Sequence, residues 1–441
     1  MTVLKLKTVR GDKPNLMINI KPKQLFASIS IYTFLIFAKS WERRNVLIGD
    51  DLRYLIPPSL KWNIRWVIEP AKNGYLNVLQ KLVGLISSFF PLENLAILMF
   101  FMTGVIWIAT SVSIQLAVHA YTQKFYAGLI SGLVLVMTPS NTLYVIGITA
   151  TAHFPALFGI LVITSFATYP SSKKIFFFMI VLMSLVFLST PLGFLVLLPI
   201  LLNSWQKRSF PSRREKIIGA LAITCSLIQY LNYRQQDARL LDSPTLRAHF
   251  YNLRWAMYSL FPAPFRNRSL SSSSIIQDAP MVIVFVFVLT TFVFFCATNR
   301  ESQSIKTAVK MMGIAFFALN IELILSGQNY LHYLLIPSGL YLVALVIIFT
   351  STESKFVMWT KITGIIFALV MSINVATSFW SPDYDELFTD ARWSGSYEKN
   401  SWSDKIEIGR AKCLNSDTEI QLGDKDNLEF YFYVSCESLE K

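Results

Sequence analysis

The chain has 441 residues, of which 53% are hydrophobic and 15% are charged, whereas soluble domains typically hold about 25% charged residues. Its mean hydropathy is +0.47, and uncharged runs recur at lengths that suit a bilayer. This composition excludes a secreted or cytosolic globular protein and predicts an all-α polytopic membrane protein.

The formal net charge of +13 is unevenly distributed. Residues 381–441 hold 14 acidic and 7 basic residues, so this tail carries −7 and the first 380 residues carry +20. Basic residues of polytopic proteins mostly lie in cytoplasmic loops or contact lipid phosphates. The basic balance therefore does not indicate a nucleic-acid partner.

Stretches with few or no charged residues, separated by short polar breaks, predict about eleven membrane-spanning helices. We expect them within residues 25–38, 95–118, 125–172 (two), 175–206 (two), 217–233, 281–298, 308–326, 331–349 and 356–379. The stretch 175–206 is long for one crossing and short for two, so the break from Ser189 to Gly193 predicts a hairpin of two short helices.

The distribution of Lys and Arg predicts a cytoplasmic N-terminus, because basic residues from Lys5 to Lys23 precede the first span. Alternation then puts the loop 40–93, the loop 234–280 and the tail on the outer side. The first span could instead be the core of a signal peptide, but no small-residue cleavage site follows it. The expected organisation is a transmembrane domain, residues 1–380, and an acidic extracytoplasmic domain, residues 381–441.

The tail contains Cys413 and Cys436, and a cysteine pair in a small domain facing an oxidising compartment is expected to form a disulfide. Two unpaired thiols in a cytosolic tail are the alternative. The alternation of residues 428–434 predicts a strand, so we expect the tail to fold as a small α/β or β-containing domain.

Acidic residues of the first outer loop are candidates for a site. Asp50 and Asp51 follow the first span closely, and Arg53 and Glu69 accompany them. Adjacent carboxylates near a membrane surface either face solvent or serve a site. The apolar spacing over residues 76–86 predicts an amphipathic helix lying on the membrane, which suits a lipid-borne substrate.

The second outer loop carries arginines and no lysine, among them Arg239, Arg247 and Arg254. Because the guanidinium group can grip a phosphate with two parallel hydrogen bonds, this loop is a candidate phosphate clamp. Contact with lipid headgroups is the alternative. Glu322, near the outer end of a span, is a further candidate, since ionisable residues within spans are commonly functional.

No phosphate-binding glycine loop, zinc-ligand spacing or nucleophile elbow occurs, so the sequence indicates no certain cofactor. Glu69 and His153 are the candidate ligands for a divalent metal, although a loop histidine such as His153 is more often structural.

The sequence resembles the GT-C superfamily of integral-membrane glycosyltransferases in five features. They are the cytoplasmic N-terminus, the acidic pair Asp50 and Asp51, the following surface helix, the hairpin at Ser189–Gly193 and the outer C-terminal domain. The resemblance covers residues 1–380. Size, composition and tail are most similar to bacterial enzymes that decorate lipopolysaccharide O-antigen or other cell-surface glycans, such as the serotype-converting glucosyltransferases.

This resemblance implies a multi-pass protein of the bacterial inner membrane that binds a polyprenyl-phosphate-linked sugar and a glycan acceptor. It implies inverting transfer of a hexose such as glucose at the outer face, with Asp50 or Asp51 as the general base. A polysaccharide polymerase and a lipid-linked glycan flippase or transporter are the rival classes. A transporter would need polar residues along the spans, and in the sequence these cluster in the outer loops.

Overall fold

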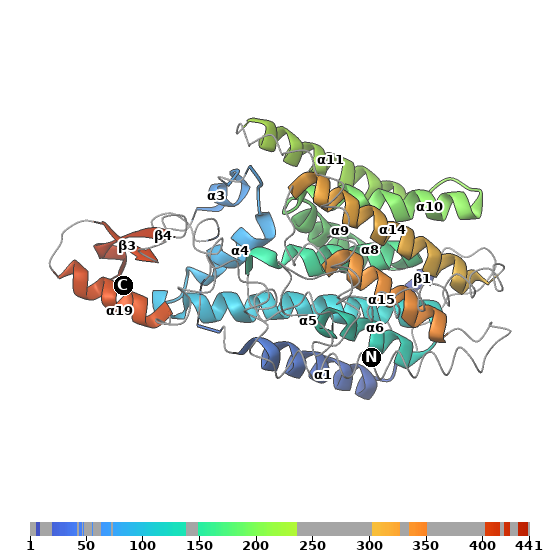
Figure 1. Cartoon of the computed structure of the whole chain (residues 1–441), viewed down its shortest axis with the longest axis horizontal. Helices are drawn as coiled ribbons and strands as arrows, with labels where there is room; N and C mark the ends of the chain where they lie inside the picture. The colour runs from blue at the N-terminus through green and yellow to red at the C-terminus, as the bar shows by residue number, and fades with distance from the viewer. Residues whose placement is uncertain are drawn as a thin grey trace, which may run out of the picture.

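The computed structural model of the protein describes residues 6–8, 20–41, 44–45, 47, 55, 63–71, 74–137, 149–235, 302–326, 335–350, 402–414, 419–423 and 431–439. These parts are mostly helical, as the composition predicts (Figure 1). Their strands form two antiparallel pairs.

Most of the helices overlap the stretches expected as spans. Those of the bundle and first loop are α1 (Pro22–Ser40), α3 (Ile64–Ile68), α4 (Val78–Ser87), α5 (Leu95–Thr122), α6 (Phe125–Met137), α8 (His153–Phe166), α9 (Lys173–Phe187), α10 (Leu197–Lys207), α11 (Arg213–Gln235), α14 (Gln303–Ser326) and α15 (Leu335–Thr350). Of these, α10, α11 and α14 include charged residues. The short 3-10 helices are η3 (Leu92–Asn94), η4 (Thr149–Thr151) and η5 (Pro191–Val196).

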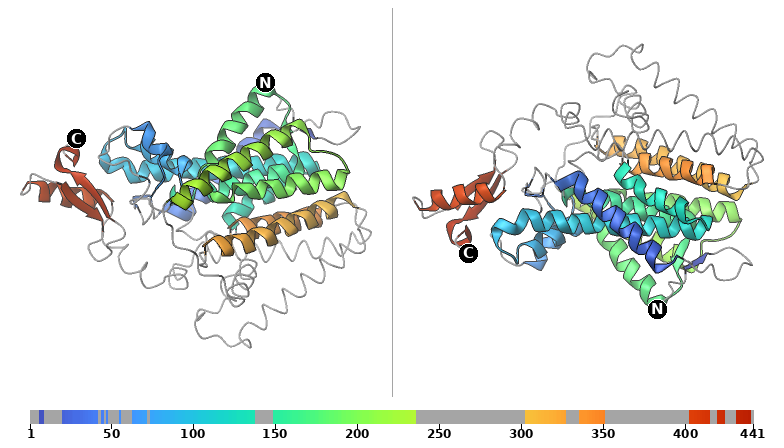
Figure 2. Two further views of the ribbon diagram at one scale, coloured as in Figure 1. Left: turned by 90° about the horizontal axis from the view of Figure 1, so that it is seen from above. Right: turned by 90° about the horizontal axis from the view of Figure 1, so that it is seen from below.

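The long helix α5 is the central element of the bundle. It packs against α1, α4, α6 and α8, and the antiparallel pair α14 and α15 covers α6 and α8 (Figures 1 and 2). On the other side, α9, η5, α10 and α11 complete the bundle. The predicted break at Ser189–Gly193 is present: α9 ends at Phe187, and Thr190 Oγ1 accepts a hydrogen bond from Leu192 N at the start of η5.

Within the described residues, two helical stretches are long and apolar enough to cross a membrane, Leu92–Thr122 and Gln303–Ile321. Four shorter apolar helices accompany them: Val78–Ser87, Phe125–Val136, His153–Phe166 and Leu335–Thr350. The spans expected at 281–298 and 356–379 lie outside the described residues.

α5 and α6 approach very closely through two glycines of α6, spaced four residues apart. A Cβ atom at Gly128 would lie 2.6 Å from the Gln115 carbonyl oxygen, and one at Gly132 would lie 2.7 Å from the Ser111 carbonyl oxygen. Small residues at this spacing let helix backbones meet in membrane proteins. Beside this contact, Tyr32 of α1 donates from its hydroxyl to Gln115 Oε1 (2.7 Å), which ties α1 to α5.

One end of the bundle, here called the basic end, gathers the turns that the sequence assigns to the cytoplasm. These turns carry Lys124, Lys173, Lys174, Lys207, Arg208, Arg213, Arg214, Lys216 and Lys306. Hydrogen bonds join them across the bundle: Arg214 donates to Ser171 O (2.9 Å), and Tyr121 donates to Gln303 O (3.0 Å). The strand β1 (Leu6–Thr8) also pairs here with β2 (Thr168–Pro170).

The opposite end, here called the loop end, carries α3, α4 and a small C-terminal unit (Figure 1). This unit comprises α19 (Trp402–Cys413), β3 (Glu419–Gly423), β4 (Tyr431–Ser435) and α20 (Cys436–Leu439). The strand β4 confirms the predicted strand over residues 431–434, and it pairs antiparallel with β3.

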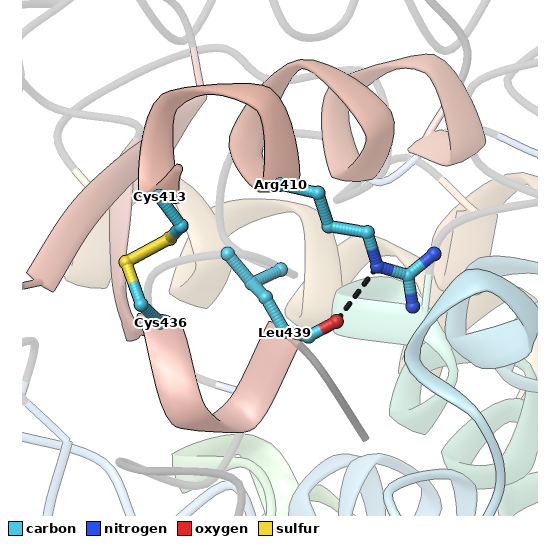
Figure 3. The surroundings of a disulfide bond; sticks show 4 residues. All are labelled: Arg410, Cys413, Cys436 and Leu439. Carbon is cyan, nitrogen blue, oxygen red and sulfur yellow. Dashed lines mark hydrogen bonds between the residues drawn. A yellow bond between two sulfur atoms is a disulfide. The ribbon is translucent and has the colours of Figure 1, made fainter. Parts of the chain in front are cut away.

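The predicted disulfide between Cys413 and Cys436 is present, with the two Cα atoms 5.5 Å apart (Figure 3). It joins the end of α19 to the start of α20. Arg410 Nε also donates to Leu439 O (2.7 Å), so two links hold α20 against α19. In the loop-entropy model a bridge between residues 23 positions apart stabilises such a unit by about 3 kcal/mol.

We expect a membrane-impermeant thiol reagent to label Cys413 and Cys436 in intact cells only after reduction. The reason is that the tail is predicted to lie outside, where its thiols are oxidised. Labelling is read by mass spectrometry, and the single variants Cys413→Ser and Cys436→Ser should react without reductant because each leaves one free thiol. Labelling that requires cell lysis would place the tail in the cytoplasm.

Candidate functional site at the loop end

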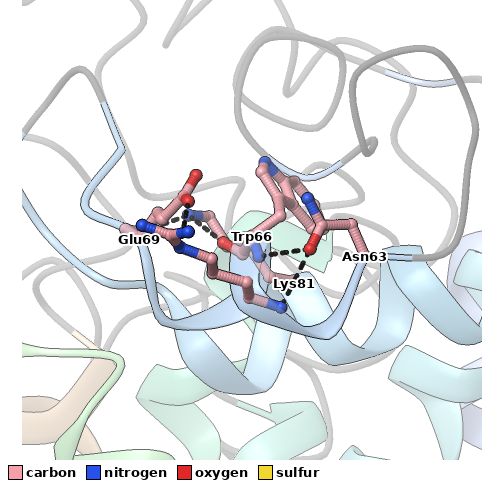
Figure 4. A network of polar contacts seen from close by, with 5 residues as sticks. Asn63, Trp66, Glu69 and Lys81 are labelled. Carbon is pink, nitrogen blue, oxygen red and sulfur yellow. Dashed lines mark hydrogen bonds and ion pairs between the residues drawn. The ribbon is translucent and has the colours of Figure 1, made fainter.

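Local capping positions α3 and α4 beside each other (Figure 4). Asn63 begins α3, and its Oδ1 atom accepts a hydrogen bond from Arg65 N (3.0 Å). At the other end of α3, the Lys81 ammonium donates to the backbone oxygens of Trp66 (3.2 Å) and Glu69 (2.6 Å). A cation near the C-terminal carbonyls of a helix is favourable because these oxygens have no partner within the helix.

Lys81 is 1% exposed, which is rare for a lysine. Its ammonium also lies over the Trp66 ring, 5.0 Å from the ring centroid. Burial lowers the pKa of Lys81 from 10.5 to about 8, and the Glu69 carboxylate opposes that shift. Backbone carbonyls and an aromatic face therefore stabilise the buried ammonium group, and a carboxylate lies nearby.

We expect Lys81→Met to remove a pH dependence of stability between pH 8 and pH 10.5. Over this range the unfolded chain holds the Lys81 proton and the folded protein does not, so the free energy of unfolding rises with pH. The rise should be ~1–3 kcal/mol. Unfolding of the wild type at both pH values measures it.

The exposed Lys174→Met variant serves as the control and should follow the wild type. If Lys81→Met and Lys174→Met have the same pH dependence, Lys81 does not titrate in this range in the folded protein.

The helix α4 and the residues just before it connect the first loop to the α9–η5 turn, to α11 and to α8. Leu79 N donates to Ser189 Oγ in the α9–η5 turn (2.7 Å), and Leu76 N donates to Gln229 Oε1 of α11 (3.2 Å). The Gln80 side chain contacts Nδ1 of His153 at the start of α8.

The predicted helix is present as α4, but its polar side chains face the protein and not solvent. Gln80 and Lys81 are 1% exposed, and Val83 and Leu85 are buried as well. The polar side chains that the pattern assigns to solvent bond instead to α3 and His153. α4 is thus inserted into the loop end of the bundle.

The candidate ligands Glu69 and His153 contact two adjacent residues of α4. Lys81 donates to the Glu69 carbonyl, and Gln80 contacts His153. The Glu69 carboxylate pairs with Arg65 at 3.4 Å, with both side chains largely exposed. Within the described residues, no group of three His, Cys, Asp or Glu side chains could hold a metal ion.

The C-terminal unit is anchored on the first loop and on the start of α5. Trp402 donates from Nε1 to Leu92 O (2.7 Å) and from its backbone to Asn45 O (2.8 Å). Arg410 forms an ion pair with Glu93. The pKa of Glu93 lies below its usual value because the carboxylate accepts a hydrogen bond from its own backbone N–H and another from Arg410.

An apolar cluster fills the contact between the C-terminal unit and the rest of the loop end. Its buried members are Leu47, Leu55, Val83, Leu92, Leu95, Ala96, Met99, Trp402, Ile406, Ile420, Leu422, Val434 and Leu439. The first two of these residues, Leu47 and Leu55, flank the segment that contains the candidate bases. The C-terminal unit therefore fixes the chain on both sides of that segment.

Several predicted site residues lie outside the described residues, namely Asp50, Asp51, Arg53, Arg239, Arg247 and Arg254. Glu322 lies on α14, but its side chain is outside the described part.

Sequence reasoning missed the groups that build the loop end, above all Lys81, Gln229 and Trp402. No periodicity marks their roles, because each acts through a partner far along the chain.

The sequence matches no model of a known protein family and no curated protein.

Proposed function

We propose that the protein is an integral-membrane glycosyltransferase that moves a sugar, such as glucose, from a polyprenyl-phosphate carrier to a cell-surface glycan. The proposal includes about eleven spans, a cytoplasmic N-terminus, an outer C-terminus and an inner-membrane location in a bacterium. The observation that carries it is the separation of the bundle into a basic end and a loop end. At the loop end, the first loop, His153 and the disulfide-bonded unit converge.

Exposed apolar side chains support the membrane part of this proposal. Large side chains on the outside of five bundle helices are each more than half exposed: Phe34, Val105, Phe177, Leu227 and Phe316. Soluble monomers rarely expose large apolar patches, whereas a lipid-facing surface requires them.

The proposed reaction takes place at the loop end. Asp50 or Asp51 accepts the proton of the acceptor hydroxyl, whose oxygen attacks the anomeric carbon of the sugar. The bond from this carbon to the carrier oxygen breaks, and the polyprenyl phosphate leaves with the electron pair, so the configuration is inverted. Arg53 and the loop arginines Arg239, Arg247 and Arg254 would neutralise the departing phosphate, and Glu322 would contribute to substrate binding. Glu69 and His153 remain the residues proposed for a divalent metal.

The test is transfer by the purified, full-length protein in lipid nanodiscs, using radiolabelled polyprenyl-phosphate glucose with and without an O-antigen acceptor. The expected result is acceptor-dependent movement of label into glycan. If the donor stays intact with all hexose donors and glycan acceptors tried, the glycosyltransferase proposal fails.

A transporter of lipid-linked glycan is the second candidate, and one observation favours it. Polar residues do occur along a span: Thr103, Trp107, Ser111, Gln115 and His119 are all buried in α5. These buried polar residues are of the kind that a transporter would need along a span. In sealed proteoliposomes a transporter would move labelled donor across the membrane without forming a new glycosidic bond, whereas the enzyme would form the bond.

A further inference from the structure

A row of polar side chains runs along most of α5. Thr103, Trp107, Ser111 and Gln115 are completely buried, and His119 is 7% exposed. The spacing is four residues throughout, so each polar group lies one turn below the previous one and about 40° further around the helix. The lower part of the row, around Ser111 and His119, lies at the contact with α6, where Ser131 is also completely buried.

Thr103, Gln115 and the nearby Tyr121 have hydrogen-bond partners. At the loop end, Thr103 Oγ1 and Thr149 Oγ1 share a hydrogen bond of 2.9 Å. Near the middle, Gln115 accepts from Tyr32 and donates to Ser28 Oγ (2.9 Å). Below it, Tyr121 of the same helix shares a hydrogen bond with Thr307 (2.9 Å).

Between these bonded groups lie four buried polar atoms without a hydrogen-bond partner among the described residues. They are Trp107 Nε1, Ser111 Oγ, His119 Nδ1 and Ser131 Oγ. A buried polar group without a partner costs about 1–3 kcal/mol, so such groups normally bind ordered water.

The two serines lack a hydrogen bond that hydroxyls in helices usually make. A hydroxyl in a helix usually bonds to the carbonyl four residues earlier. Thr110 and Ser113, the neighbours of Ser111 on α5, do so at 2.8 Å each. Ser111 and Ser131 have the same option but make no such bond, and bound water would supply the missing partner.

The spacing of the row suits water. Four residues of α-helix rise about 6 Å, which is close to the length of two consecutive hydrogen bonds of about 2.8 Å. One water molecule can therefore bridge successive polar groups along α5.

We propose that the contact between α5 and α6 is a binding site for a row of internal water molecules, held by Trp107, Ser111, Ser131 and His119. The row extends from the Thr103 and Thr149 pair at the loop end toward the basic end. This part of an otherwise apolar bundle is therefore hydrated. The hydration does not depend on which reaction takes place at the loop end.

Millisecond X-ray radiolysis of the full-length protein in nanodiscs tests this proposal, because hydroxyl radicals formed from bound water oxidise adjacent side chains. Mass spectrometry then gives the oxidation rate of each residue. Met99 on α5 and Met311 on α14 are the controls, since they are 1% and 0% exposed in apolar surroundings and methionine reacts readily. We expect Trp107 to be oxidised about tenfold faster than either methionine.

The double variant Ser111→Ala and Ser131→Ala should slow the oxidation of Trp107 about threefold or more, because the water loses two of its partners. If Trp107 in the wild type is as protected as Met99 and Met311, the contact is dry and the proposal is wrong. Unchanged oxidation of Trp107 in a correctly folded double variant would also overturn it, because the water would not be bound by these serines.

Discussion

Asp50→Asn or Asp51→Asn is expected to lower the rate of sugar transfer by about 10²–10⁴-fold, the contribution of a positioned general base. Asparagine keeps the size of the side chain but cannot accept the proton of the acceptor hydroxyl. Stability should change little, because the sequence predicts an outer loop here and an exposed carboxylate contributes little to stability. The measurement is the initial rate with labelled donor in nanodiscs, together with the melting temperature of each variant.

Glu407→Gln on the exposed face of α19 is the matched control, since it removes a carboxylate from the same end of the protein. It should transfer sugar at the wild-type rate. Full activity of both Asp50→Asn and Asp51→Asn would remove the first-loop base from the mechanism.

Gly132→Ala is expected to destabilise the bundle by ~1–3 kcal/mol, the usual cost of overpacking a close contact. The added Cβ atom would lie 2.7 Å from the Ser111 carbonyl oxygen, a distance that real Cβ atoms essentially never show. Backbone atoms cannot rotate away as a side chain can, so α5 and α6 must separate. That movement would also disturb the hydrogen bond between Tyr32 and Gln115.

Thermal unfolding of the purified variants measures this effect, with Gly313→Ala on α14 as the control. A Cβ atom at Gly313 meets nothing within 4 Å, so alanine there should be neutral or stabilising by up to about 1 kcal/mol. Equal melting temperatures for Gly132→Ala and Gly313→Ala would contradict the close contact between α5 and α6.

The sequence predicts the local elements well, because charge-free runs and turn residues act over short distances. It locates α5, α11 and α14, the break before η5, the strand β4 and the disulfide. It does not predict helix lengths reliably: α6 has 13 residues and α8 has 14, about 20 Å each against a hydrocarbon core of ~30 Å. Packing between helices determines which short helices cross a bilayer, and the hydrophobic periodicity of the sequence carries no information about that packing.

The candidate site is less predictable because long-range contacts build it. Lys81 reads as a solvated residue of an amphipathic helix, yet backbone carbonyls and the Trp66 ring make its burial tolerable. Gln80 and His153 are 73 residues apart, and Leu76 and Gln229 are 153 apart. The row of polar residues on α5 does have a signal in the sequence, namely its four-residue spacing. A search for spans by their lack of charged residues overlooks this spacing.

The anchoring of Trp402 on Leu92 has a consequence for the order of events during synthesis. The two residues are 310 positions apart, so at about 5–20 residues per second a ribosome needs roughly 15–60 s to make the second partner after the first. During that interval Leu95 and Met99 lack the apolar cover that Trp402 and Ile406 later supply. The loop end is thus completed last, and the apolar start of α5 is a surface for chaperones to shield in the newly made chain.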